Sequence, residues 1–215
     1  MGKKKIRFLE NKNYLKLLTL LALLFLVLIF KNNNLQNLVL IFLGFYLVVI
    51  LSPKETRVII LVAFTLRLIL LLVNSYLFTL PEVIGSDAGM FEATALNWSQ
   101  NGLAWLFNNF TSGAFLYSWF IAVFYVIFGH NPFLIEFINV LFGTFTVLVV
   151  YLICGEIFSR KEALISAFIT SIFPSLVYFS VVMLREAPAV FFFTYGTYLL
   201  LKWFKEGYVG YLIAS

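Results

Sequence analysis

Long apolar stretches alternate with short polar ones along most of the chain. The apolar stretches occupy residues 14–30, 35–52, 58–80, 133–154, 163–182 and 187–204. Each has close to the ~20 apolar residues that a transmembrane α-helix needs. The pattern therefore predicts an all-α, polytopic bundle of about six membrane-spanning helices. A further apolar stretch begins at Tyr208 and continues to Ser215, so we expect the sequence to be the front part of a longer protein.

The longest polar interruption, residues 84–98, follows the third apolar stretch. Within it, a helix is expected to carry apolar residues on one face. That face comprises Ala88, Phe91, Ala95 and Trp98. An amphipathic helix at the end of a membrane span is expected to lie along the bilayer surface. Asp87, at the start of this helix, is then expected at the boundary between lipid and water.

Composition supports a membrane protein. Hydrophobic residues make up 62% of the chain and charged residues 12%, whereas a soluble domain is about half apolar and about a quarter charged. The net charge of +5 comes from basic residues in short clusters between apolar stretches, which is typical of membrane orientation signals and not of nucleic-acid binding. The single cysteine, Cys154, excludes an internal disulfide, and the single histidine, His130, argues against a histidine-based metal site.

Residues 114–129 allow two interpretations, because this apolar segment could cross the bilayer or lie on its surface. If it crosses, four basic residues fall outside the cell together with Lys31. These four are Arg160, Lys161, Lys202 and Lys205. If it does not cross, they lie inside with the basic N-terminus, and only Lys31 and Arg185 remain outside. The positive-inside rule favours the second arrangement, as does the short length of the segment. We therefore expect an outer segment, 81–131, with two membrane-parallel helices and a cytoplasmic N-terminus.

This topology brings the loop 183–188 to the same membrane face as Asp87, so that Glu186 and Arg185 share that face with it. Pro174 is expected to kink the preceding span. Simpler roles remain open for both acids. Ser86 or Asp87 can cap the helix that follows, and Glu186 can form an ordinary surface pair with Arg185.

Arg67 lies near the middle of the third apolar stretch, where an arginine costs roughly 2.5–3.5 kcal/mol on insertion scales. Such an arginine is a functional candidate by default, and we consider Glu136 or a lipid phosphate as its partner. Snorkelling to an interface is the alternative.

An ordered set of short motifs resembles GT-C glycosyltransferases, in particular the protein O-mannosyltransferase group that includes the lipid A aminoarabinose transferase (glycosyltransferase family 39-like). The motifs are Ser86-Asp-Ala-x-x-Phe91-x-x-x-Ala95, Ile127-Phe-Gly-His-Asn-Pro132, Asn139-x-Leu-x-Gly-Thr-x-Thr146, Phe158-Ser-Arg-Lys-Glu-Ala-Leu164, Phe173-Pro174 and Met183-Leu-Arg-Glu-Ala-Pro-Ala-Val-Phe-Phe-Phe193. The resemblance covers about residues 57–207. We therefore divide the chain into an additional pair of spans, 1–56, and the N-terminal part of a GT-C-like catalytic domain, 57–215. Glu136 stands where the family commonly has an arginine.

The resemblance implies transfer of a sugar from a polyprenyl-phosphate carrier to a hydroxyl of a glycan, lipid or protein, with inversion at the anomeric carbon. It implies that Asp87 is the catalytic base and that Glu186 is the acidic residue of the second outer loop. Arg185, Arg67 and Glu92 are expected to bind substrate. No metal ligand set is assigned, although a divalent cation remains possible. The alternatives are a transporter or flippase of lipid-linked intermediates and a non-catalytic assembly subunit.

Overall fold

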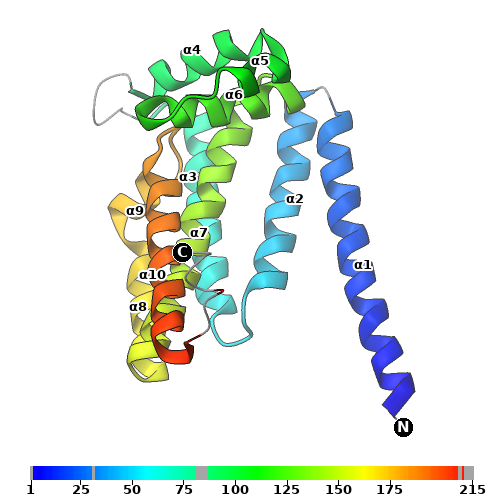
Figure 1. Ribbon diagram of the computed structural model, residues 1–215, viewed down its shortest axis with the longest axis vertical. Helices are drawn as coiled ribbons and strands as arrows, with labels where there is room; N and C mark the ends of the chain where they lie inside the picture. Colours follow the sequence, from blue (N-terminus) through cyan, green and yellow to red (C-terminus); the bar gives the residue numbers. More distant parts are fainter. Residues whose placement is uncertain (1, 31, 81–86, 208–209, 211–215) are drawn as a thin grey trace.

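In the computed structural model of the protein, every secondary-structure element of the described residues is a helix (Figure 1). The structure describes residues 2–30, 32–80, 87–207 and 210, with side chains from residue 16 onward. The elements in chain order are α1 (Gly2–Ile29), α2 (Asn33–Leu51), α3 (Arg57–Tyr76), α4 (Asp87–Ser99), α5 (Gly102–Asn108), the 3-10 helix η1 (Gly113–Phe115), α6 (Leu116–Phe128), α7 (Pro132–Ile157), α8 (Arg160–Ile172), α9 (Pro174–Tyr178) and α10 (Glu186–Glu206). The predicted helical class is confirmed, whereas the stretch after Tyr208 lies largely outside the described residues.

The long helices run alternately up and down and form one bundle (Figure 1). The largest apolar core joins α2, α3 and α7 around the buried rings of Phe64 and Phe137. Gly44 of α2 permits this close approach, because a Cβ at that position would lie 2.5 Å from the tip of the Phe137 ring and 2.6 Å from that of Phe64. Helix α2, which belongs to the predicted additional pair of spans, is therefore packed into the same core as α3 and α7.

Three helices, α2, α3 and α7, are long and apolar enough to cross a membrane, judged by length and composition within the described residues. Many large side chains on the outer sides of the bundle are exposed apolar groups, among them Phe193 at 79% and Phe204 at 75%. An aqueous protein would not leave so many of these groups in water. The chain is accordingly a helical membrane protein, and the predicted number of six spans remains a prediction.

The predicted fifth span, residues 163–182, is not one helix. Helix α8 ends at Ile172, Phe173 is extended with ψ of 118°, and α9 is only 5 residues long. Residues 179–185, which we call the connecting segment, then lead to α10 without regular helix. Pro174 lacks the N–H that would continue α8, and so the expected kink is a complete break.

Helices α4, α5 and α6 lie across one end of the bundle (Figure 1). Helix α6 has 13 residues and is thus about 20 Å long, which is shorter than the ~30 Å hydrocarbon core. Its inner face packs on Phe91 and Ala95 of α4, with Ala88 and Trp98 partly buried in the same cluster. The face predicted for residues 88–98 is therefore confirmed, and residues 114–129 lie across the bundle instead of along it.

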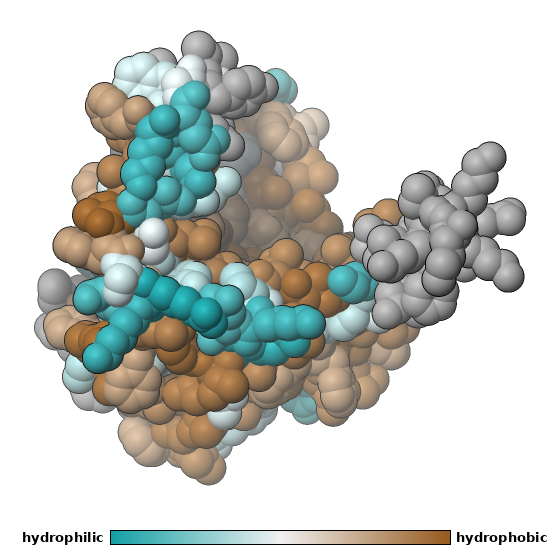
Figure 2. Space-filling model, turned by 90° about the horizontal axis from the view of Figure 1, so that it is seen from below, coloured by the Kyte–Doolittle hydropathy of each residue, from teal (hydrophilic) through white to brown (hydrophobic). Residues whose placement is uncertain are grey.

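Charged side chains gather at the opposite end of the bundle (Figure 2). Ion pairs join them across the loops and helix ends there: Arg160–Glu55 at 3.1 Å, Lys202–Glu156 at 2.9 Å, Lys202–Glu206 at 2.9 Å and Lys205–Glu156 at 3.1 Å. The basic residues predicted to be cytoplasmic therefore lie at the end away from α4–α6. This separation agrees with the predicted orientation, which itself remains a prediction.

Candidate functional site

A cavity of about 450 Å³ opens beneath α4, where α3, α7 and the connecting segment meet. Four carboxylate side chains line it, and they come from three different helices. They are Asp87 and Glu92 of α4, Glu136 of α7 and Glu186 of α10. A cavity of this size can hold a sugar-sized ligand with a few polar contacts. The two acids that sequence analysis singled out therefore share one cavity at the end of the bundle.

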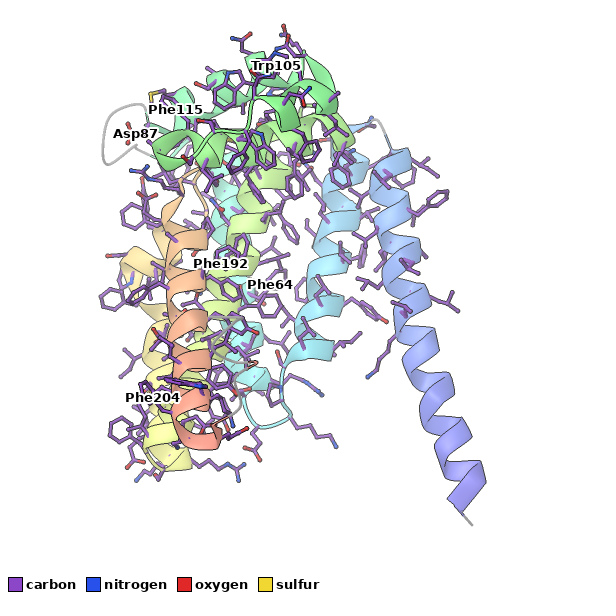
Figure 3. The ribbon with its side chains drawn as sticks, in the orientation of Figure 1. Phe64, Asp87, Trp105, Phe115, Phe192 and Phe204 are labelled. Atoms are coloured by element: carbon purple, nitrogen blue, oxygen red, sulfur yellow. The ribbon has the colours of Figure 1, made fainter. Side chains whose placement is uncertain are left out.

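Asp87 is the first residue of α4, and its side chain is exposed (Figure 3). A carboxylate at this position is stabilised by the positive end of the helix dipole. The alternative capping residue, Ser86, lies outside the described residues. Asp87 also lines the cavity, so that its position suits both a structural and a chemical role.

Glu186 is the first residue of α10 and is half-buried. Its Oε2 atom is buried and has no hydrogen-bond partner among the described residues. A buried carboxylate oxygen without a donor is costly, so a donor supplied by a ligand would be favourable. No ion pair between Glu186 and Arg185 is found in the described part of the chain. The structure therefore does not contain the simple surface pair considered as an alternative.

Arg185 is exposed, and its guanidinium lies 5.8 Å from the ring centre of Phe91 in α4. This cation–π contact joins the connecting segment to the helix that carries Asp87. Arg185 does not line the cavity itself. No hydrogen bond from its guanidinium is found within the described residues, although its neighbours Leu184 and Glu186 both line the cavity.

Glu92 contacts His130, with Oε1 and Nε2 3.0 Å apart. His130 also packs edge-on against Tyr125 of α6 at 4.9 Å between ring centres. His130 lies in the turn between α6 and α7 and contacts one of the cavity acids. Sequence reasoning missed this contact because 38 positions separate the two residues.

Glu136 lies one turn into α7, and its Oε1 accepts a hydrogen bond from Asn74 of α3 at 3.3 Å. Asn74 also donates to the backbone carbonyl of Val181 at 3.4 Å. Sequence analysis considered Glu136 only as a partner for Arg67. Instead, Glu136 is part of the cavity wall and contacts the connecting segment through Asn74.

Arg67 is fully buried, with 0% of its surface exposed, and does not line the cavity. Its Nη1 donates to the carbonyls of Ser171 at 2.9 Å and Ala63 at 3.1 Å, and its Nε donates to Ser180 Oγ at 3.3 Å. No carboxylate of the described residues forms an ion pair with it, so Glu136 is not its partner. The helix break explains these contacts, because carbonyls near the end of α8 need donors from elsewhere.

Asn139 of α7 is fully buried and joins three parts of the site. Its Nδ2 lies within hydrogen-bond distance of the carbonyl oxygens of Val182 at 2.8 Å and Leu184 at 2.9 Å and of the hydroxyl of Tyr117 at 2.9 Å, and its two hydrogens are shared among these three acceptors. Burial raises the pKa of Tyr117 well above its usual value, so the hydroxyl stays protonated. Asn139 thus holds the connecting segment against both α7 and α6.

The described acids do not form a metal-binding cluster: no three His, Cys, Asp or Glu side chains in that part of the chain come together as possible ligands. The four carboxylates of the cavity are distributed around its wall. The possible divalent cation therefore remains untested.

Residues 112–215 match the dolichyl-phosphate-mannose-protein mannosyltransferase family. The matched range contains Glu136, Arg185 and Glu186 but begins after Asp87 and Glu92. No curated protein and no solved structure matches the chain significantly. The helical bundle and the family match over residues 112–215 agree with the resemblance to GT-C glycosyltransferases read from the sequence, and this part of the chain is similar to that family.

Proposed function

We propose that the protein transfers a sugar from a polyprenyl-phosphate carrier to an acceptor hydroxyl, at the membrane face that carries α4–α6. The observation that supports this most is the cavity of about 450 Å³, because Asp87 and Glu186 reach it from separate helices. The acceptor class, whether glycan, lipid or protein, stays open. The division into an additional N-terminal pair of helices and a catalytic region is part of the same proposal.

In the proposed reaction, the acceptor oxygen attacks the anomeric carbon from the side opposite the phosphate. The new carbon–oxygen bond forms as the bond to the phosphate oxygen breaks, and the bonding electrons leave with the phosphate. Asp87 accepts the hydroxyl proton. The anomeric configuration is inverted because attack and departure take place on opposite sides.

The remaining residues have supporting roles. Glu186 accepts hydrogen bonds from sugar or acceptor hydroxyls through its unpartnered oxygen. Arg185, at the rim, pairs with the phosphate oxygens, for which the planar guanidinium is well suited. Glu92 contributes a further acceptor on the cavity wall, with His130 fixing its position. Arg67 supports the site from within the bundle, since it is buried behind the connecting segment.

The test uses the full-length protein in liposomes with dolichyl phosphate carrying radiolabelled mannose, together with separate lipid, glycan and protein acceptor fractions. We expect Asp87→Asn to lower turnover by about 10²–10⁴-fold, the usual contribution of a general base. Glu55→Gln is the matched acid-to-amide control, because Glu55 pairs with Arg160 at the opposite end of the bundle. Turnover of Asp87→Asn within a few-fold of wild type would exclude the base assignment.

The same liposomes distinguish the enzyme from a flippase. An enzyme releases free polyprenyl phosphate and moves the label to an acceptor. Movement of the intact labelled donor across the bilayer, with no bond cleaved, would contradict the proposal.

A further inference from the structure

The motif Asn139-x-Leu-x-Gly143-Thr-x-Thr146 has no role in the proposed chemistry, yet it faces the connecting segment. Residues 139, 143 and 146 are spaced by four and three positions and therefore lie on one face of α7. Asn139 donates to two carbonyls of the segment, and Gly143 and Thr146 line a small cavity that Ser180 and Glu186 also line. We propose that this face of α7 positions the connecting segment, and thereby Glu186, relative to Asp87. The expected effect on turnover rests on the proposed function, whereas the expected effect on the position of the segment does not.

The connecting segment needs such support because it is irregular backbone inside an apolar bundle. Val182 and Met183 are buried at 9% and 4% exposure, and carbonyls there cannot rely on water. Asn139 supplies the donors for Val182 and Leu184, while Asn74 supplies one for Val181. The buried amide of Asn139 and the partly buried amide of Asn74 thus hold the segment in place before α10 begins.

Gly143 provides the space for the segment to approach α7. A Cβ at this position would overlap Ser180 Oγ and lie 2.8 Å from Ser180 Cβ. It would also lie 3.0 Å from Arg67 Nε, the atom that donates to Ser180. Ser180 is buried at 1% exposure. A side chain at position 143 would therefore push the segment and α10 away from α7.

The same face also reaches α4, which carries Asp87. Asn139 donates to the hydroxyl of Tyr117, and the Tyr117 ring contacts Phe91 edge-on at 5.5 Å between centres. Arg185, in the connecting segment, contacts the same Phe91 ring. One buried amide is thus linked to α4 through Tyr117 and Phe91, and to α10 through the connecting segment. Asn139 and Gly143 are positioning residues, because neither lines the large cavity.

Two readouts test this inference in the full-length protein. The first is turnover, for which Asn139→Leu should lower kcat by about 10²-fold, the cost of a misplacement near 1 Å. KM should stay within about threefold, because the groups that contact substrate are unchanged. The second is the distance between spin labels at Asn97→Cys on α4 and Ala189→Cys on α10, in a Cys154→Ser background. Both positions are exposed and one lies on each acid-bearing helix.

Thr144→Val is the matched control on the same helix. Its hydroxyl is buried without a partner among the described residues, so the isosteric change removes no hydrogen bond. We expect wild-type label distances and wild-type kcat from it. A loss of kcat as large as that of Asn139→Leu would overturn the specific role of Asn139.

A second pair of variants keeps the test decisive if Asn139→Leu does not fold. Gly143→Ala should shift the label distance and lower kcat, and adding Ser180→Gly should restore both, because it removes the two closest atoms that the new methyl group meets, Oγ and Cβ of Ser180. Failure of Ser180→Gly to restore the distance would overturn the steric role of Gly143.

The two readouts separate this inference from the proposed function. A distance that shifts together with a fall in kcat supports both. A distance that does not shift in either Asn139→Leu or Gly143→Ala overturns the positioning role. A clear shift with unchanged kcat supports the positioning role and contradicts the proposed role of Glu186 in turnover.

Discussion

The turn between α6 and α7 contains a buried amide network whose loss should be measurable. Asn131 is 2% exposed, and its Nδ2 donates to Gln36 Oε1 at 3.0 Å and to Asn37 Oδ1 at 2.9 Å. Gln36 in turn donates to the carbonyls of Val27 and Phe128, each at 3.0 Å. The network joins α1 and α2 to the turn that carries His130. We predict that Asn131→Leu destabilises the bundle strongly.

The magnitude follows from the acceptors that the substitution leaves behind. Asn131→Leu removes two hydrogen bonds and leaves two buried amide oxygens without those donors, each costing roughly 1–3 kcal/mol. The expected loss in the free energy of unfolding is therefore about 2–6 kcal/mol. Structural relaxation around the two amide oxygens should keep the loss in the lower half of this range. Asn131 is the N-cap residue of α7 but makes no side-chain capping bond, so no capping loss is added.

The assay is reversible unfolding in mixed detergent micelles, followed by tryptophan fluorescence. Asn101→Leu is the matched control. Asn101 is also an N-cap residue without a capping bond, but its side chain is exposed and its donations are long, at 3.4 and 3.5 Å. We expect the control to change stability by no more than about 0.5 kcal/mol. Equal stability of the two variants would refute the claim that the network supports the turn.

Three further predictions concern packing, pH and the exposed pair at the cavity. Gly44→Val should destabilise the bundle by about 1–3 kcal/mol through overpacking against Phe64 and Phe137. The control is Gly155→Ala, where the nearest neighbouring atom would be 4.0 Å from the new Cβ. It should be neutral or stabilising in the same unfolding assay. Burial raises the pKa values of Tyr117 and Tyr125 above the ordinary value of 10.0, so the unfolded chain loses these protons first and stability should fall as pH rises above 10. The Tyr117→Phe/Tyr125→Phe variant should lose that part of the pH dependence, and an unchanged slope would contradict it. His130→Ala should lower the free energy of unfolding by at most about 1 kcal/mol, because the contact with Glu92 is partly exposed. A decrease of several kcal/mol would show that the pair is more than a local contact.

The position of α6 was predictable from the sequence because charge placement and helix length both favour a surface helix. The same kind of reasoning correctly located Asp87 at the start of α4 and the buried face of that helix. Helix length, charge placement and the apolar face of a helix depend on residues that are close together in the chain, so they can be read from one sequence.

The break between α8 and α9 was underestimated because the stabilising donors are distant in sequence. Arg67 reaches Ser171 and Ser180 across 104 and 113 positions. Apolar residues 163–182 appear continuous when these donors are not considered. Likewise, nothing in the sequence indicated that Glu136 lines the cavity or that His130 contacts Glu92, because the residues involved are distant in sequence. Side-chain donors from other helices determine these features, and periodicity within one helix contains no information about them.

Cysteine accessibility shows whether the helices that carry Asp87 and Glu186 present both acids to one membrane face. In a Cys154→Ser background, Asn97→Cys on α4 and Ala189→Cys on α10 are treated in intact cells with a membrane-impermeant maleimide, with Lys161→Cys at the opposite end of the bundle as the reference. We expect positions 97 and 189 to react from outside and position 161 to react only after the membrane is permeabilised. Labelling of positions 97 and 189 from opposite sides of the membrane would contradict the shared site.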